Sequence, residues 1–127
     1  MNTNDEALTR EIFGDLIYSY SRAEALADGV LVDLTERARC HGIRYPTACT
    51  AGVWSVIDTI DDPHRALRHV QVLGRTDAVL AAMLAAIRQA RGTDRVEFSA
   101  LGAALWAQCG PGDTAAPVIT IMLQGED

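Results

Sequence analysis

The sequence contains no lysine, and all eleven of its basic residues are arginines. Seventeen acidic residues leave a formal net charge of −6. Proteins that bind the nucleic acid backbone directly do so with clustered Lys and Arg side chains, whereas these arginines are scattered from Arg10 to Arg95. We therefore expect no direct nucleic acid binding, and a basic surface on another protein is the partner that suits such a chain.

Cysteines, aromatic residues and long apolar runs are also scarce. The three cysteines, Cys40, Cys49 and Cys109, are an odd number, and the first residues, MNTNDEALTREIF, carry acids where a signal peptide has its basic and apolar regions. No uninterrupted apolar run reaches the roughly 20 residues that cross a bilayer. We therefore expect reduced thiols, no membrane partner and a cytoplasmic location.

The remaining composition is that of a globular protein. Apolar residues make up 49% and charged residues 22% of the 127 residues, which is far from the composition of disordered chains. A chain of this length can bury a core without help from metals or disulfides. We expect a single globular domain over residues 1–127, with frayed ends at 1–7 and 124–127.

Short helices with clear end signals are predicted in the first third of the chain. In SRAEALADG, Ser21 and Glu24 have the spacing of a capping box, in which each side chain bonds the other's backbone N–H. The pattern predicts a helix over 22–28 that ends at Gly29. The apolar run VLVDL at 30–34 predicts a short strand.

Further helices are predicted up to residue 91. Thr35 is placed to cap a short helix, ERARCH, which Gly42 ends. A third helix is expected to begin after Pro46 with a Thr cap. From Arg65 to Arg91 the apolar residues follow a 3.6-residue period, with a kink or break expected near Gly74 and Thr76.

After Gly92 the apolar pattern changes to a period of two. RVEFSAL, ALWAQC and VITIML read as three strands separated by turns that contain glycine. The sequence thus predicts an α+β fold, in which N-terminal short helices and a long helix pack on a C-terminal three-stranded antiparallel meander.

The loop CGPGDTAAP at 109–117 raises the question of a ligand. A phosphate-binding loop leads from a strand into a helix N-terminus and usually offers a Lys, but this loop is expected to join two strands, and Pro111 lacks an N–H. We interpret it as a turn that Asp113 closes.

Catalytic and metal-binding candidates are weak. Cys109 would need a neighbouring base, and the histidines are distant in sequence. The Cys40–His41 pair with Cys49 lacks the spacings of structural zinc sites, and a helix cap explains the DDPH motif at 61–64 equally well. We predict no metal site and no cofactor.

Two stretches of the chain resemble a known family. They are IFGDLIYSYSRAEALADGVLVDLTERARCHGIRYP at 12–46 and CGPGDTAAPVITIML at 109–123. They are similar to an uncharacterised family, a domain of unknown function, of small proteins carried on bacterial plasmids, phages and integrative elements. The segment from Asp61 to Arg95 departs from that pattern. The resemblance implies an accessory gene of a mobile element, a setting in which small acidic proteins often inhibit host defences, and it brings no catalytic residue.

Three functions stay open on this reading. The favoured one is a small acidic non-enzymatic binding protein of a mobile element, an anti-CRISPR or anti-restriction type of inhibitor that blocks a nucleic-acid-binding or protein interface of a host complex. The alternatives are a small enzyme or ligand-binding domain with a site near Cys109 and Asp113, and a homodimeric structural accessory built through exposed apolar positions of the long helix. The residues assigned to the partner-binding face are Asp15, Tyr18, Tyr20, Glu24, Asp28, Asp33 and Glu36.

Overall fold

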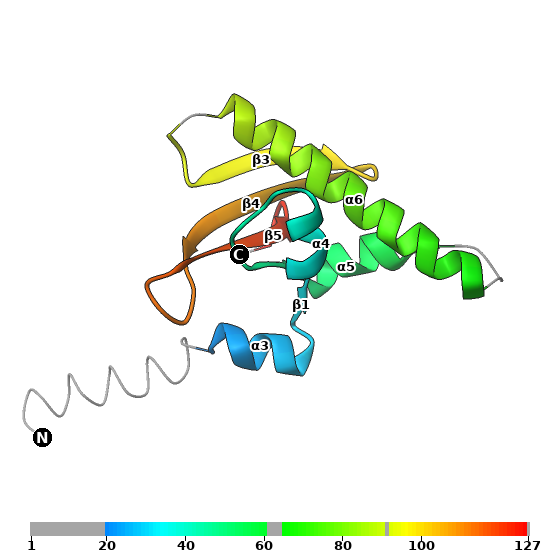
Figure 1. Ribbon diagram of the computed structural model, residues 1–127, viewed down its shortest axis with the longest axis horizontal. Coiled ribbons are helices and arrows are strands. Elements are labelled where there is room, and N and C mark those ends of the chain that lie inside the picture. Colours follow the sequence, from blue (N-terminus) through cyan, green and yellow to red (C-terminus); the bar gives the residue numbers. More distant parts are fainter. Residues whose placement is uncertain (1–19, 61–64, 91, 127) are drawn as a thin grey trace, which may run out of the picture.

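The computed structural model describes residues 20–60, 65–90 and 92–126, and these form an α+β fold with helices on both sides of a sheet (Figure 1). The elements in chain order are α3 (Arg22–Asp28), β1 (Leu31–Asp33), α4 (Thr35–Cys40), β2 (Thr47–Thr50), α5 (Ala51–Asp58), α6 (Arg65–Gln89), β3 (Arg95–Ala100), β4 (Ala103–Pro111) and β5 (Pro117–Leu123). Asp15, Tyr18 and the N-terminal end at 1–7 lie outside the described residues, so what was expected of them stays a prediction.

The sheet is mixed and has five strands in the order β1-β2-β5-β4-β3. The expected meander is present as the antiparallel neighbours β3, β4 and β5. The prediction of a three-stranded sheet is wrong, because β2 pairs parallel to β5 and β1 pairs antiparallel to β2. The strand that the sequence reading missed is TACT at Thr47–Thr50, which was assigned to the start of a helix. Its first three residues are all buried, so it shows none of the alternation that marks a half-exposed strand.

The helix after β2 begins later than the sequence predicted, at Ala51. The N-cap is Thr50, whose hydroxyl accepts a hydrogen bond from the backbone N–H of Val53 at 3.3 Å. A Thr cap was expected, but not a strand in front of it. Strand and helix thus follow each other without a loop, and this brings α5 directly onto the end of the sheet.

One face of the sheet carries the core. Alternate residues of the strands face α5 and α6 and lie in one buried cluster, as expected for a sheet that is covered by helices. The buried strand residues in this cluster are Cys49, Val96, Leu105, Ala107, Ile119 and Ile121. The buried helix residues against them are Val53, Ile57, Val79, Leu80 and Met83.

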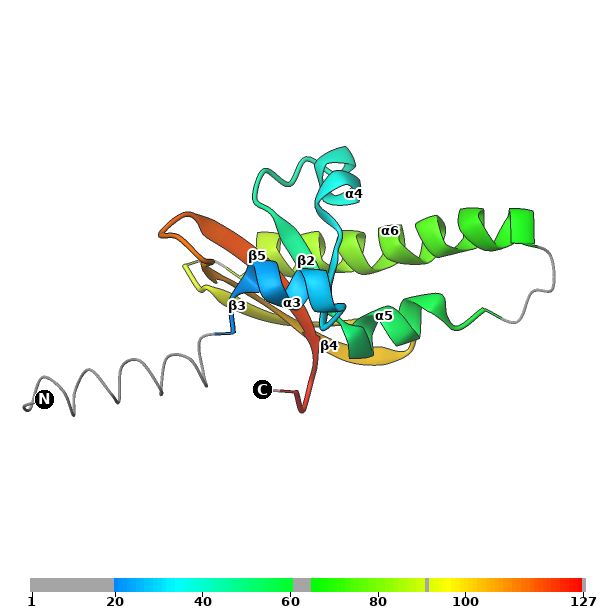
Figure 2. The same ribbon diagram turned by 90° about the horizontal axis from the view of Figure 1, so that it is seen from below.

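The long helix α6 is continuous from Arg65 to Gln89, and the break expected near Gly74 does not occur. Thr76 does not cap a new helix; its hydroxyl donates to the carbonyl of Val72 one turn earlier at 2.8 Å, and the residue is buried. Packing of the following residues against the sheet stabilises the helix enough to tolerate one glycine, which costs only about 1 kcal/mol. In Figure 2 the N-terminal end of α6 runs beyond the strands.

The short helices follow their local signals, with one exception. Helix α3 spans residues 22–28 as predicted, and the Ser21 hydroxyl accepts the N–H of Glu24 at 3.0 Å. At α4 the prediction that Thr35 is the N-cap is wrong. Leu34 occupies that position, and the Asp33 carboxylate accepts the N–H of Thr35 at 3.0 Å.

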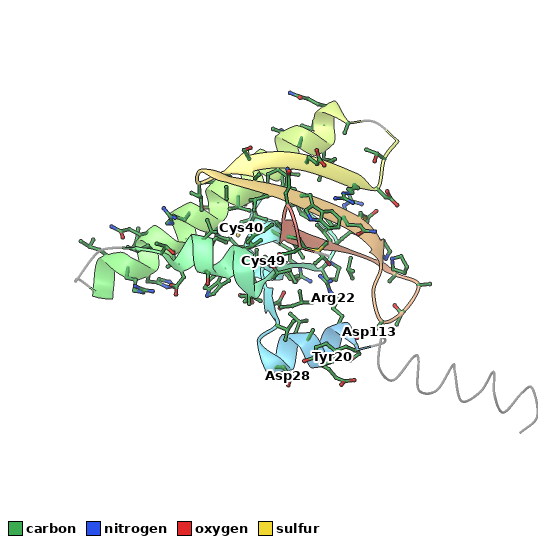
Figure 3. The ribbon with its side chains drawn as sticks, turned by 180° about the vertical axis from the view of Figure 1, so that it is seen from behind. Tyr20, Arg22, Asp28, Cys40, Cys49 and Asp113 are labelled. Atoms are coloured by element: carbon green, nitrogen blue, oxygen red, sulfur yellow. The ribbon has the colours of Figure 1, made fainter. Side chains whose placement is uncertain are left out.

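The CGPGDTAAP loop joins β4 to β5, so it connects two strands as expected, but its acid does more than close a turn. One Asp113 carboxylate oxygen accepts the N–H of Arg22 at 2.6 Å, and the other accepts the N–H of Ala23 at 3.0 Å. The loop therefore caps the N-terminus of α3 from about 90 residues away in sequence. Figure 3 shows Asp113 beside Arg22.

Arg22 fixes the same helix to the sheet. Its guanidinium donates to the Thr120 hydroxyl at 2.6 Å and to the Ile119 carbonyl at 2.8 Å. Thr120 belongs to the face of the sheet opposite Ile119 and Ile121, so α3 lies on the side away from α6. Of the C-terminal end that was expected to fray at 124–127, residue 124 is bonded to the start of β4, since the backbone N–H of Gln124 donates to the Ala104 carbonyl at 3.0 Å.

We expect Asp113→Ala to destabilise the protein by about 1–2 kcal/mol, because two N–H groups at the start of α3 lose their acceptor. Urea unfolding followed by far-UV circular dichroism measures this change. Asp94→Ala, which removes an exposed acid from another loop, is the control. Equal midpoints for the Asp113 variant and the wild type would contradict the capping role.

Candidate protein interface

The acids predicted to form one partner-binding face fall into two groups. Tyr20, Glu24 and Asp28 lie together along α3, where the Tyr20 hydroxyl donates to the Asp28 carboxylate (Figure 3). Asp28 is the main reason that the pKa of Tyr20 rises to about 12. Glu24 and Asp28 are both exposed, and no described Arg forms an ion pair with either of them. This group is therefore a solvated acidic patch on the outside of α3.

Asp33 and Glu36 form the second group, beside α6. Both are exposed and lie at the rim of a groove of about 690 Å³ between α4, α5 and α6. The apolar walls of this groove are formed by Leu34, Trp54, Val72 and Leu73. A concave apolar surface with acids at its rim has the features of a binding site.

A cluster of three side chains fixes the groove's shape. Arg37 of α4 donates two hydrogen bonds to the Asp77 carboxylate of α6, at 2.7 and 2.6 Å, and His41 Nε2 lies 2.8 Å from the same carboxylate. The bidentate pair holds α4 against α6. It also offsets the charge of Arg37, so Asp33 and Glu36 dominate the charge at the rim.

Sequence reasoning placed Asp33 and Glu36 on the acidic face but missed the groove itself. Trp54 contacts the core and also lines the groove. The cluster around Asp77 was missed because its members are separated by about 40 residues. The sequence does contain one signal for this cluster: the short helix α4 has several Arg and His residues at its end and only one acid, so its basic side chains need an acidic partner elsewhere.

Cys109 and Asp113 do not share a cleft. Asp113 lines a cavity of about 390 Å³ between α3 and the sheet, whereas Cys109 lines one of about 210 Å³ near Tyr45 and Ile87. Of the described histidines, His41 bonds Asp77, and His69 lines the groove at α6.

The described residues also bear on the metal candidates. Residues 20–60, 65–90 and 92–126 contain no group of three His, Cys, Asp or Glu side chains placed to hold a metal ion. The DDPH motif at 61–64 lies outside the described residues. Cys49 is buried in the core, and this burial raises the pKa of its thiol to about 12. A thiol in that state is a poor metal ligand and a poor nucleophile.

Helix α6 exposes apolar side chains, the positions on which the homodimer alternative depends. Leu67 is 52% exposed and Val70 is 63% exposed. By length and composition, Leu67–Gln89 could cross a bilayer although no uninterrupted apolar run is long enough, and only 22% of an 18-residue stretch within it is buried. Core helices of soluble proteins can be equally long and apolar, but most of their residues are buried. This helix therefore has more apolar surface than the core uses.

No protein-family model matches the sequence, and neither a curated protein nor a solved structure shows significant similarity to it.

We expect the three thiols to react at different rates with Ellman's reagent at neutral pH. Cys40 is exposed and should give the fast phase, while Cys49 should react only in denaturant, because burial holds its thiol in the protonated form. Cys40→Ser should lose the fast phase. Modification of Cys49 in the folded protein at the rate of an exposed thiol would contradict the assigned burial.

The cluster around Asp77 predicts a specific acid dependence. Hydrogen bonds from Arg37, then from His41, lower the pKa of Asp77 to about 2. Because the folded-state pKa is lowered, the cluster stabilises the protein above about pH 4, and that stability is lost as the pH falls from 4 toward 2. Asp77 is 31% exposed, so we expect no more than about 1 kcal/mol.

Urea unfolding of Asp77→Asn between pH 2 and 7 tests this expectation. Its stability should fall less between pH 4 and pH 2 than that of the wild type, and Asp94→Asn should follow the wild type. Identical pH profiles for Asp77→Asn and the wild type would show that the cluster contributes nothing.

Proposed function

We propose that this chain is a non-enzymatic binding protein, and that the groove between α4 and α6 takes a basic amphipathic segment of a partner protein. The observation that carries the proposal is the combination of apolar walls with an acidic rim. Trp54 and Leu73 offer a surface for an apolar side chain. Asp33 and Glu36 lie at the rim, where they can bind Arg or Lys side chains next to that apolar residue of the partner.

The construction of the groove supports binding by a preformed surface. Asp77 fixes α4 on α6 through a bidentate contact, and Asp33 is itself held by the Thr35 backbone and hydroxyl. A rim that is already ordered loses little conformational entropy when the partner binds. The same contact offsets the positive charge of Arg37, so this residue does not repel a basic partner.

Within this proposal, the partner class is a complex that handles nucleic acid. Surfaces that bind phosphate backbones are rich in Arg and Lys, and an acidic protein with a net charge of −6 can compete for them. The resemblance to mobile-element proteins favours a host defence complex as that partner. Inhibition would then occur by occupation of the basic surface, without chemistry.

Two variants with matched charge changes test the groove. In Asp33→Asn/Glu36→Gln the rim loses both charges, and Asn retains an acceptor for the N–H of Thr35. In Asp94→Asn/Glu97→Gln two exposed acids near β3 are lost instead. Tagged proteins are compared by affinity purification from host lysate, and the affinity for the isolated partner is then measured at low and moderate salt.

We expect the rim variant to bind its partner about five- to tenfold more weakly, corresponding to about 1 kcal/mol or slightly more. The loss should shrink at moderate salt, since exposed charges are screened. The β3 variant should bind like the wild type. Equal affinities for all three proteins, or an equal loss in both variants, would contradict the groove as the binding site.

A further inference from the structure

A second surface of the molecule lies on the outward side of α6, away from the groove. With 100° between successive helix residues, the residues that face away from the sheet form one stripe along the helix. The described members of this stripe include Leu67, Val70, Gly74, Ala78, Ala81 and Ala85, and all six are exposed. The groove uses the other flank of α6, including Val72 and Leu73.

The outward stripe carries almost no charge. Of its described side chains only Arg88 is charged, and it lies at the C-terminal end. The charges on either flank are engaged elsewhere in the fold. Arg75 donates to the carbonyls of Ile57 at 2.9 Å and Val56 at 2.7 Å in α5, and Asp77 binds α4. Although the chain has a net charge of −6, this exposed strip about 30 Å long contains no acid.

We propose that α6 pairs with α6 of a second copy of this chain in an antiparallel arrangement. Two acidic proteins repel each other unless their contact is free of acids, and this stripe is such a contact. The small side chains from Gly74 to Ala85 let the two helices approach closely. Leu67 and Val70, 52% and 63% exposed, provide apolar area at the ends of the contact.

A two-fold axis perpendicular to the helix pairs small residues of one copy with small residues of the other. With the axis between residues 79 and 80, Ala78 of one copy faces Ala81 of the other, and Gly74 faces Ala85. The antiparallel arrangement places the two Arg88 side chains at opposite ends, where their apolar stems can cover Val70 of the other copy. A parallel pair would bring both arginines together. Opposed helix dipoles favour the same arrangement.

The size of the contact fits a reversible dimer. Two helices side by side over about 30 Å bury on the order of 600 Å² per copy, at the lower limit of about 1,200 Å² in total for specific interfaces. We therefore expect the dimer to dissociate in the micromolar range. This inference does not depend on the groove, which stays open to a partner in the pair.

Cysteine cross-linking tests both the contact and its direction. In a Cys40→Ser background, Ala81→Cys should form a covalent dimer with a short bismaleimide. Val70→Cys alone should not, because the two residues 70 would be separated by about 28 Å along the helix axis. A mixture of the Val70→Cys and Gln89→Cys proteins should cross-link to each other. The background protein without a new cysteine is the control.

Two results of the cross-linking experiment would contradict the proposal. Cross-linking of Val70→Cys with itself and not with Gln89→Cys would overturn the antiparallel arrangement. Absence of cross-links at every position would overturn the dimer.

A second experiment distinguishes a dimer from a lipid surface. Ala81→Glu changes an exposed helix position and should abolish the Val70→Cys/Gln89→Cys cross-link when present in both proteins, whereas Ala27→Glu on α3 should have no effect. If wild-type protein floats with uncharged phosphatidylcholine vesicles and Ala81→Glu does not, the stripe binds lipid and the self-pairing proposal is wrong.

Discussion

Helix α6 packs along one side only, and this constraint determines most of the protein's surface. Val79, Leu80 and Met83 turn into the sheet and are completely buried, and one sheet face cannot cover more than about half of a helix. The remaining half of α6 retains apolar residues such as Val70. In the described part of the chain no element lies over it. Both surfaces that we assign to partners border this helix, the groove on one flank and the outward stripe on its far side.

Long-range polar contacts hold the small helices around this core. Asp113 caps α3 from the loop between β4 and β5, and Arg22 ties the same helix to β5. Asp77 holds α4 on α6 through Arg37. Short helices of six or seven residues have little stability of their own, so these contacts supply what local sequence cannot. They also explain why several charged residues of this acidic chain are structural and unavailable to a partner.

Much of the fold could be predicted because its signals are local. The Ser21 cap and Gly29 bracket α3 within nine residues, and the alternation of Val96 and Phe98 with Glu97 and Ser99 marks β3. Strand β2 could not be recognised, since TACT at 47–50 is short, buried on both faces and directly followed by a helix. The groove could not be recognised either, because its shape depends on Asp77 meeting Arg37 across 40 residues, and no local pattern encodes such a contact.

We assign the uncovered side of α6 to a contact between two copies of the chain, and sedimentation equilibrium tests this claim. A concentration series through the micromolar range should show the mass rising from 13.7 kDa toward twice that value, while Ala81→Glu stays at the mass of one chain. A mass of 13.7 kDa for the wild type at every concentration would contradict the claim.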